Sequence, residues 1–408
     1  MRTELAEPFA STAAGAIAEE ALRACVHCGM CNAACPTFRL TGDELDGPRG
    51  RIWLVKAALE GETVGRLSQV HLDRCLSCRA CETVCPSGVA YHRLADIGRE
   101  RLAEAVRRPW RERLKRQTIR LVFASPALAR AVLTLGRVAR PILPRSVRGK
   151  VPPAAPRLAA PAETGPRRME LLGGCVQRAA APHFNASARR VFARFGVALR
   201  ETPGVGCCGA LHAHLDAPEA ARSRARRNLQ AWSAALAAGS EGVVVASSGC
   251  AAFIGDYPDL LAGEPQWREA AIALADKVKD PVQVIETFDL APDSIQPGAL
   301  AVHEPCTFRH GLKLPGRVGA LLSRLGCELA PVADVDICCG SAGAYAITQP
   351  DLSKPLQSAK IAALTGGGPT AIVTGNIGCW LQLAETAPVP VRHWLEVVDA
   401  ATQARESA

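Results

Sequence analysis

Short apolar runs and longer amphipathic patterns alternate in the second half of the chain. Four apolar runs end just before or close to a cysteine, and patterns with helical period lie between them. This order of strands and helices predicts small parallel α/β units. Ligands gather beyond the carboxyl ends of such strands, so the cysteines that follow should lie together there. The predicted strands are 169–172, 243–246, 299–302 and 371–374, and the predicted helices are 186–195, 218–238, 317–325 and 351–365.

The cysteines indicate that these units are two copies of one fold. Each copy begins with a cysteine, has a Cys-Cys-Gly turn 32 positions later, and closes with a further cysteine. The copies are offset by 131 residues at the first two features and by 129 at the third, which indicates an internal repeat. The candidate ligands are Cys175, Cys207, Cys208 and Cys250 in copy 1, and Cys306, Cys338, Cys339 and Cys379 in copy 2.

Adjacent cysteines rarely form a disulfide with each other because the ring is strained. We therefore interpret each set of four as an additional cluster or redox site; the alternative is that they are small packing residues. Cys327 has no counterpart in copy 1 and is expected to be a buried free thiol. The stretch 204–209 matches G-x-G-x-x-G, but copy 2 lacks the first two glycines. The sequence thus predicts no flavin or nicotinamide site in this chain.

Two motifs near the N-terminus have the spacing C-x2-C-x2-C-x3-C-P. Three thiolates at this spacing wrap three corners of a [4Fe–4S] cube, and the fourth cysteine ligates the other cluster. Zinc is the alternative, but it typically takes two separated C-x2-C pairs. We predict two [4Fe–4S] clusters that move single electrons, and no catalytic residue. The ligands are Cys25, Cys28, Cys31 and Cys85 for cluster 1, and Cys75, Cys78, Cys81 and Cys35 for cluster 2.

Composition places these cysteines in a reducing compartment. The chain has 408 residues with 48% hydrophobic and 21% charged positions, as expected of a globular protein. It shows neither an apolar stretch long enough for a membrane span nor a signal-peptide pattern. The sequence thus predicts a cytoplasmic protein. Its 17 cysteines are then expected to be metal or redox ligands, not a disulfide framework.

One segment carries the positive charge. Residues 101–150 contain 14 Lys or Arg and two acidic residues, a charge of +12, whereas the whole chain has +9. Such a segment can lie on the inner face of the cytoplasmic membrane. The alternative is a helical arm that presents arginines to solvent or to an acidic partner. Nucleic acid is not expected, because the segment lacks interleaved aromatic residues.

These features predict an α+β multidomain fold. A helical dicluster ferredoxin-like domain comes first, and a basic arm with a Pro/Ala-rich linker follows it. Two small α/β cysteine-rich repeats complete the chain. The predicted boundaries are 1–100, 101–168, 169–290 (copy 1) and 299–400 (copy 2).

The combined pattern resembles the glycolate oxidase iron–sulfur subunit family from about Cys25 to Trp394. Supporting details are GPRGRI at 47–52, HEPC at 303–306, Lys360, and GNIGC at 375–379. The resemblance implies that the chain is the iron–sulfur subunit of a glycolate dehydrogenase complex. The subunit is then expected to be inactive without its partners. It also implies two flavoprotein-type partner subunits that oxidise glycolate to glyoxylate, or D-lactate in some relatives. Electrons would then pass towards a membrane quinone.

Related families keep other functions open. The third subunit of anaerobic glycerol-3-phosphate dehydrogenase shares these motifs. Heterodisulfide reductase also resembles the chain, but its repeats end in C-x2-C and hold a noncubane cluster. Here Phe253 and Gln382 stand at that last position, so each copy has four cysteines instead of five. Two further hypotheses are a catalytic subunit that reduces a disulfide or a quinone itself, and a redox sensor or scaffold.

Overall fold

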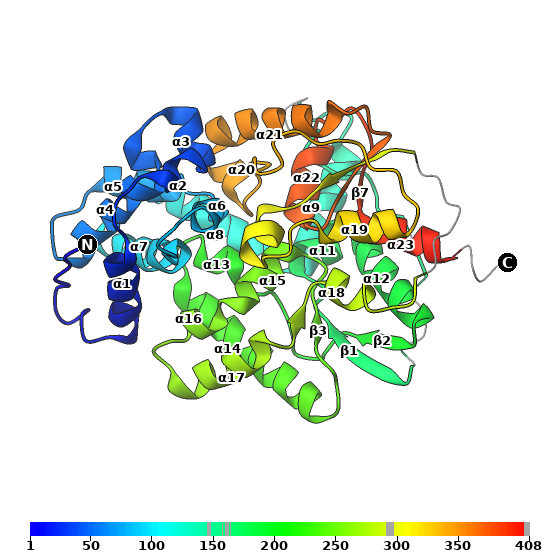
Figure 1. The fold of residues 1–408 in the computed structure, drawn as a ribbon, viewed down its shortest axis with the longest axis horizontal. Coiled ribbons are helices and arrows are strands. Elements are labelled where there is room, and N and C mark those ends of the chain that lie inside the picture. The colour runs from blue at the N-terminus through cyan, green and yellow to red at the C-terminus, as the bar shows by residue number, and fades with distance from the viewer. Residues whose placement is uncertain (145–147, 157, 160–162, 164, 291–297, 404–408) are drawn as a thin grey trace.

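In the computed structural model, a helical N-terminal domain lies beside two α/β units (Figure 1). The structure describes residues 1–403 except 145–147, 157, 160–162, 164 and 291–297. In Figure 1 the N-terminal domain is blue to cyan on the left, copy 1 is mostly green below, and copy 2 is yellow to red above and to the right. The predicted fold class is therefore confirmed.

The N-terminal domain is built around the crossing of helices α4 (Pro48–Leu59) and α7 (Tyr91–Ala105). Gly98 of α7 permits this crossing, because a Cβ there would lie 2.4 Å from Val55. Buried apolar side chains from α1, α4 and α7 form the core between them. The remaining elements are α1 (Ala13–Ala24), α2 (Met30–Ala33), α3 (Pro36–Thr41), η1 (Glu44–Asp46), α5 (Arg66–Asp73) and α6 (Ala80–Thr83).

The described part of the basic segment includes the end of α7 and the helices α8 (Trp110–Phe123) and α9 (Pro126–Ala139). Arg108 and Arg116 are buried, and both pair with Asp73 of the N-terminal domain and Asp216 of copy 1. The segment is thus partly a packed arm. Among the described residues, no single helix could cross a membrane; α8 and α9 together pass by length and composition but are bent by 99°. Part of the predicted linker, at 157, 160–162 and 164, lies outside the described residues.

Copy 1 contains a four-stranded parallel sheet in the order β2-β1-β3-β4. Its strands are β1 (Arg167–Leu171), β2 (Val197–Arg200), β3 (Val243–Val244) and β4 (Val278–Lys279). Strand β1 begins two residues before the predicted run. The helices are α11 (Cys175–Ala180), α12 (Pro182–Arg194), α13 (Ala210–Ala213), α14 (Pro218–Ala237), α15 (Ser248–Gly255), α16 (Tyr257–Leu260), α17 (Pro265–Ala275) and α18 (Pro281–Ile285).

Copy 2 repeats this arrangement. Strands β5 (Leu300–His303), β6 (Ala371–Thr374) and β7 (Val391–His393) pair in parallel in that order. An isolated parallel bridge from Leu300 to Leu329 stands where copy 1 has β2. The helices are η2 (Thr307–Gly311, a π-helix), α19 (Arg317–Arg324), α20 (Tyr345–Thr348), α21 (Pro350–Thr365), α22 (Ile377–Ala384) and α23 (Trp394–Gln403).

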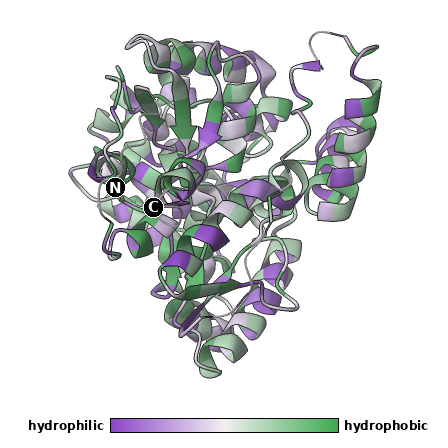
Figure 2. Ribbon diagram, turned by 90° about the vertical axis from the view of Figure 1, so that its right-hand side faces the viewer, coloured by the Kyte–Doolittle hydropathy of each residue, from purple (hydrophilic) through white to green (hydrophobic). Residues whose placement is uncertain are grey.

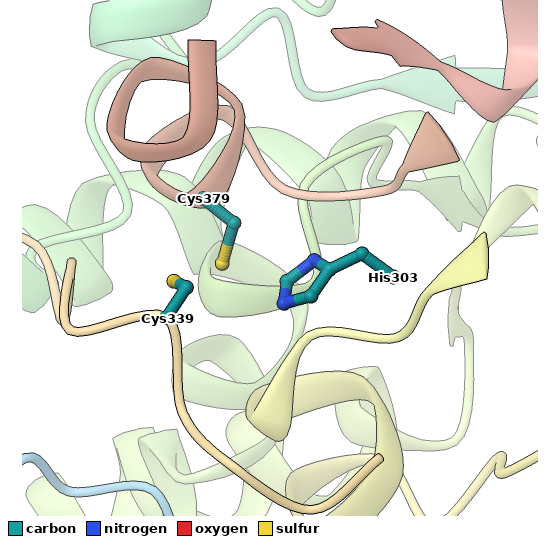
Figure 3. Close-up of side chains that lie close together, drawn as sticks. All are labelled: His303, Cys339 and Cys379. Carbon is teal, nitrogen blue, oxygen red and sulfur yellow. The ribbon is translucent and has the colours of Figure 1, made fainter. Parts of the chain in front are cut away.

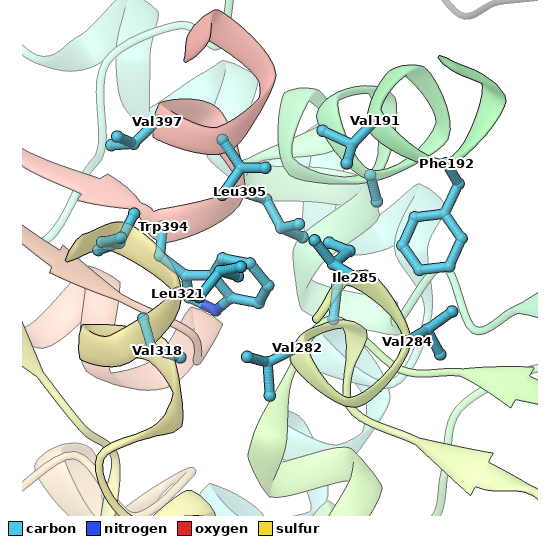
Figure 4. Packing of buried hydrophobic residues seen from close by; sticks show 14 of the residues in the cluster. Val191, Phe192, Val282, Val284, Ile285, Val318, Leu321, Trp394, Leu395 and Val397 are labelled. Atoms are coloured by element: carbon cyan, nitrogen blue, oxygen red, sulfur yellow. The ribbon is translucent and has the colours of Figure 1, made fainter. Parts of the chain in front are cut away.

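The two copies share one hydrophobic core. Figure 4 shows Phe192 of α12 and Ile285 of α18 from copy 1 in the same cluster as Leu321 of α19 and Trp394 of α23 from copy 2. Figure 2 colours the ribbon by hydropathy. Strands β3 (Val-Val) and β6 (Ala-Ile-Val-Thr) are fully buried, as expected for parallel sheets covered by helices. Cys327 is buried in this core. The copies therefore hold their cysteine sites in a fixed relative position.

Candidate metal centres

The first motif of the N-terminal domain lines a cavity of about 440 Å³, including the part open to solvent. Its three leading cysteines face Cys85 of the second motif there. Burial, and then the neighbouring Cys25, raise the pKa of the Cys31 thiol to about 11, with smaller effects from Cys28 and Cys85. A thiol whose pKa is raised beside further cysteines fits a metal cluster, whose positive charge stabilises the thiolate form. The cavity thus gathers the four cysteines predicted for cluster 1.

The second motif lines a separate cavity of about 410 Å³. Cys35 of the first motif joins Cys75, Cys78 and Cys81 in its wall. Burial, then nearby cysteines that include Cys35, raise the pKa of Cys78 and of Cys81 well above the ordinary value. Each motif thus places its fourth cysteine at the cavity of the other motif, while Cys81 lines both cavities. An exchanged fourth cysteine is the arrangement that the spacing indicates.

Both motif loops have the same backbone form. The residues before and after the second cysteine are left-handed in each motif: His27 and Gly29 in the first, Ser77 and Arg79 in the second. This conformation is rare outside glycine, so its exact repetition at three non-glycine positions reflects a shared constraint. The two left-handed residues turn the chain around a common centre.

Two arginines lie next to the cysteines that are predicted to hold cluster 2. Arg51 is fully buried, with Nη1 3.9 Å from Cys35 Sγ and 3.1 Å from Thr37 Oγ1. Arg99 donates to the carbonyl oxygen of Cys75 at 2.9 Å. Burial alone would raise the pKa of Cys75, but Arg51 and Arg99 hold it below its ordinary value. These cations therefore favour negative charge at this site.

The predicted GPRGRI stretch supplies one arginine to each cavity. Arg49 lines the first cavity and donates from Nε to Glu44 at 2.6 Å, while Arg51 lines the second. Gly50 lies between them because a Cβ there would be 2.2 Å from the Glu44 carbonyl oxygen. Two histidines near the motifs contact carboxylates: His71 contacts Asp46, and His92, which also lines the second cavity, contacts Glu82.

In copy 1, the four predicted cysteines meet beyond the carboxyl ends of β1 and β3, as the topology predicted. Hydrogen bonds from Cys175 and Cys208 lower the pKa of Cys207 and raise those of the donors, and Cys250 interacts with Cys208. Asn228 and Tyr257 hold the turn by bonding the carbonyl oxygens of its two cysteines at 3.1 and 2.7 Å. The four thiols thus form one group, in which Cys207 and Cys208 are buried and Cys175 and Cys250 are half-buried.

In copy 2, Cys306, Cys338, Cys339 and Cys379 form the equivalent group. His303 at the end of β5 joins them, with its imidazole pointing towards Cys339 and Cys379 (Figure 3). The donor atoms of these three residues lie within 4.8 Å of one another. Burial lowers the pKa of His303 well below its usual value, and the nearby Lys360 acts in the same direction.

Glycine closes both Cys-Cys-Gly turns for a physical reason. Gly209 and Gly340 have φ of +99° and +79°, and each N–H donates to the sulfur two residues earlier at 3.5 Å. A Cβ at Gly340 would lie 2.6 Å from the carbonyl oxygen of Ser353. Left-handed backbone and close approach of the next helix therefore both require glycine.

Cluster 2 and the copy 2 site are neighbours. Cys78 and Cys306 pack against one small apolar cluster formed by Leu76, Cys338, Tyr345 and Leu356. After burial, Cys306 makes the largest contribution to the raised pKa of the Cys78 thiol. Tyr345 bonds the carbonyl oxygen of Arg74, which precedes Cys75. The two centres are therefore separated by packed apolar side chains.

Sequence reasoning missed Arg51, Arg99 and Tyr345 as parts of the site. Arg51 lies in the GPRGRI stretch at 47–52, but its burial depends on contacts with Thr37 and His71, which lie far away in sequence. In the sequence, His303 is marked only as part of the HEPC stretch at 303–306. No local signal distinguishes these side chains from surface residues.

Family models match most of these regions. The 4Fe-4S dicluster domain matches residues 21–89, and the cysteine-rich domain matches residues 170–255 and 300–384. The glycolate oxidase iron–sulfur subunit of Escherichia coli is 45% identical over 408 residues, covering 99% of this chain and all of that protein.

Two further relatives are more distant. The probable glycolate oxidase iron–sulfur subunit of Bacillus subtilis is 30% identical, covering 88% of this chain and 87% of that protein. Lactate utilization protein A of an Exiguobacterium strain is 26% identical over 203 residues, covering 47% of this chain and 81% of that protein.

Proposed function

Since the chain belongs to the family of glycolate oxidase iron–sulfur subunits, we propose that it accepts electrons from a flavoprotein that oxidises glycolate to glyoxylate. The chain is an iron–sulfur electron-transfer subunit. The observation that carries the proposal is the series of neighbouring cysteine sites: two cavities that exchange their fourth cysteine, followed by the copy 2 site. Such an array suits the movement of single electrons through a protein.

The residues of this chain would hold and tune the clusters. The eight N-terminal cysteines would ligate two [4Fe–4S] clusters, which take up and release single electrons when bound. Arg51 and Arg99 place positive charge beside Cys75, which favours the more negative, reduced state of cluster 2. Tyr345 and Leu356 exclude water between this site and copy 2. The two repeat sites would hold further clusters.

The acceptor side of the proposal involves a membrane surface. Helix α9 exposes an apolar face: Leu135, Val138 and the following Ile142 are 70%, 75% and 85% exposed. Arg130 and Arg140 of the same segment are also exposed. An exposed apolar face on a segment with exposed arginines suits shallow binding to an anionic bilayer, which would bring the chain close to a quinone. The other face of α9 packs on the body through Ala129 and Leu133.

The chain is proposed to need partner subunits for activity. We therefore expect no glycolate oxidation by the purified chain, and reduction of its clusters when glycolate and the flavoprotein subunits are added under anaerobic conditions. Electron paramagnetic resonance (EPR) of the reduced clusters measures this directly. Reduction by glycerol 3-phosphate with its own flavoprotein, and not by glycolate, would favour the glycerol-3-phosphate alternative. Turnover of glycolate by the chain alone would contradict the proposal.

A further inference from the structure

The two repeats differ at one buried position beside their cysteines. His303 of copy 2 corresponds to Leu172 of copy 1, at the repeat offset of 131. Leu172 packs in the apolar core of its own copy, as expected at the end of a central strand. His303 is equally buried, at 3% exposure. A polar ring at such a position needs partners for its nitrogen atoms.

The partners of His303 orient its ring. Nδ1 lies 2.9 Å from Thr374 Oγ1, the residue directly opposite in the neighbouring strand β6. This contact leaves Nε2 for the side of the ring that faces the two cysteines in Figure 3. Metal-binding histidines typically use one ring nitrogen in a hydrogen bond and bind the metal with the other.

Other side chains near the repeat sites are not equivalent to His303. Gln382 lies three positions after Cys379, but its amide donates to Ser353 Oγ at 3.0 Å and is held by α21. In copy 1, His212 bonds the thiol of Cys207 alone. Only His303, among the described histidines, lies within ligand distance of two cysteine sulfurs of a repeat.

We propose that His303 is a direct ligand, through Nε2, of an iron in the copy 2 centre. This centre then has four thiolates and one imidazole, whereas the copy 1 centre has thiolates alone. The inference rests on the proposed function, because it requires an iron–sulfur centre at copy 2.

The ligand has a consequence for electron flow. A neutral imidazole brings no negative charge to iron, so histidine ligation raises the reduction potential relative to thiolate. The buried Lys360, near Cys338 and Cys339, acts in the same direction. The copy 2 centre is therefore more oxidising than it would be with a cysteine at position 303. When the clusters are bound, this would favour transfer of one electron from reduced cluster 2, which would be reoxidised, to the copy 2 centre.

The test is pulsed EPR of the full-length chain, purified anaerobically with its clusters and labelled with ¹⁵N only in histidine. Electron spin echo envelope modulation detects nitrogen bound to a paramagnetic iron. The EPR signal of the copy 2 centre, which is separate from those of the two N-terminal cubanes, should show ¹⁵N coupling of a bound imidazole. The coupling should be lost in His303→Leu, which copies Leu172, and should persist in the control His212→Leu. In His303→Cys, the centre should form without the coupling and at a lower potential.

Three outcomes overturn the proposal. The copy 2 centre shows no ¹⁵N coupling, the coupling survives in His303→Leu, or no paramagnetic centre besides the two N-terminal cubanes is found in any redox state. If His303→Leu does not assemble the centre, His303→Cys decides. The two N-terminal cubanes report separately on the proposed function. Their reduction by glycolate and the flavoprotein is independent of His303, so failure of the ligand assignment and failure of the function are distinguishable.

Discussion

The hydroxyl group of Tyr345 donates to the carbonyl oxygen of Arg74 at 2.9 Å, across the contact between copy 2 and the N-terminal domain. Arg74 precedes Cys75, and the Tyr345 ring packs against Cys338 and Leu76. One side chain thus touches both the cluster 2 loop and the second Cys-Cys-Gly turn. This contact fixes the spacing between two of the proposed centres.

Replacing Tyr345 should uncouple these centres without removing either. Tyr345→Ala removes the packed ring, so water enters the contact and electron arrival at copy 2 slows, while both cubane signals remain. The matched change Tyr345→Phe removes only the hydroxyl, at a cost of about 1 kcal/mol, and should leave the rate close to that of the wild type. Rapid-freeze EPR after reduction measures the rates. Equal rates in all three proteins would show that Tyr345 has no part in the path.

Arg51→Met should lower the reduction potential of cluster 2 and leave that of cluster 1 unchanged. The substitution removes a buried positive charge next to Cys35 and Cys75. It also leaves Asp46 with fewer partners, so we expect a loss of about 3–5 kcal/mol of stability. Arg49→Met is the control, because Arg49 lies at cluster 1. Redox titration followed by EPR gives both potentials; a shift at cluster 1 in Arg51→Met would refute the assignment.

Gly340→Ala should damage copy 2 far more than Gly343→Ala. Both glycines have positive φ, which costs alanine about 1–2 kcal/mol. Only Gly340 would place its Cβ against backbone, 2.6 Å from the Ser353 carbonyl oxygen, whereas Gly343 faces open space. Thermal unfolding and iron content compare the two variants. Similar losses would mean that the close approach of α21 does not constrain the turn.

His393 should make the chain less stable in mild acid. Its Nε2 bonds the carbonyl oxygen of Ala246 at 2.9 Å, and burial lowers its pKa from 6.5 to about 4. Between pH 6.5 and pH 4, His393 therefore binds a proton in the unfolded chain but not in the folded chain. Stability falls as the pH drops through this window, by about 2 kcal/mol between pH 7 and pH 5.

The variant His393→Gln tests this pH dependence. Glutamine cannot titrate, so the variant should lose less stability than the wild type on going from pH 7 to pH 5. Denaturant unfolding of both proteins at both pH values gives the difference, and contributions common to both cancel. An identical pH dependence in the two proteins is the outcome that rules out His393 as the titrating group.

The exposed face of α9 should bind anionic vesicles. The double change Leu135→Glu and Val138→Glu places acidic groups on that face and should abolish flotation with phosphatidylserine vesicles. Binding by the unmodified chain should weaken in high salt, because exposed charge attraction is screened beyond about 8–10 Å at physiological ionic strength. A Leu67→Glu variant is the control, since Leu67 is exposed on α5 instead. Vesicle binding that is unaffected by the double change would place the membrane contact elsewhere or exclude it.

Sequence spacing predicted the parts of the fold that repeat. The copy-defining cysteines and glycines recur at fixed offsets, so the parallel sheets and the meeting of Cys175 with Cys207 could be inferred. Strands β2, β4 and β7 escaped prediction because they are short and follow helices with no cysteine to mark them.

The buried partners of the sites could not be predicted in the same way. Arg51 and His303 look like surface or packing residues in sequence, and their roles depend on tertiary contacts with Thr37 and Thr374. Conversely, the basic composition of 101–150 did not show that Arg108 and Arg116 would be buried against Asp73 and Asp216. Charge counts report composition, whereas burial is decided by the fold.

The exchange of the fourth cysteine between the N-terminal motifs is the central claim. It assigns Cys85 to the cluster held by Cys25, Cys28 and Cys31, and Cys35 to the other. Serine oxygen is a harder and weaker ligand for these irons than thiolate. Combining Cys85→Ser with Cys28→Ser should therefore damage one cluster twice, whereas combining Cys85→Ser with Cys78→Ser should damage both.

EPR of the two reduced double variants tests this claim most directly. The account predicts that an almost intact cubane signal from the second motif survives in the Cys28 combination, and that neither cubane signal is intact in the Cys78 combination. A surviving cubane signal only in the Cys78 combination would contradict the exchange and would show that each motif holds its own cluster.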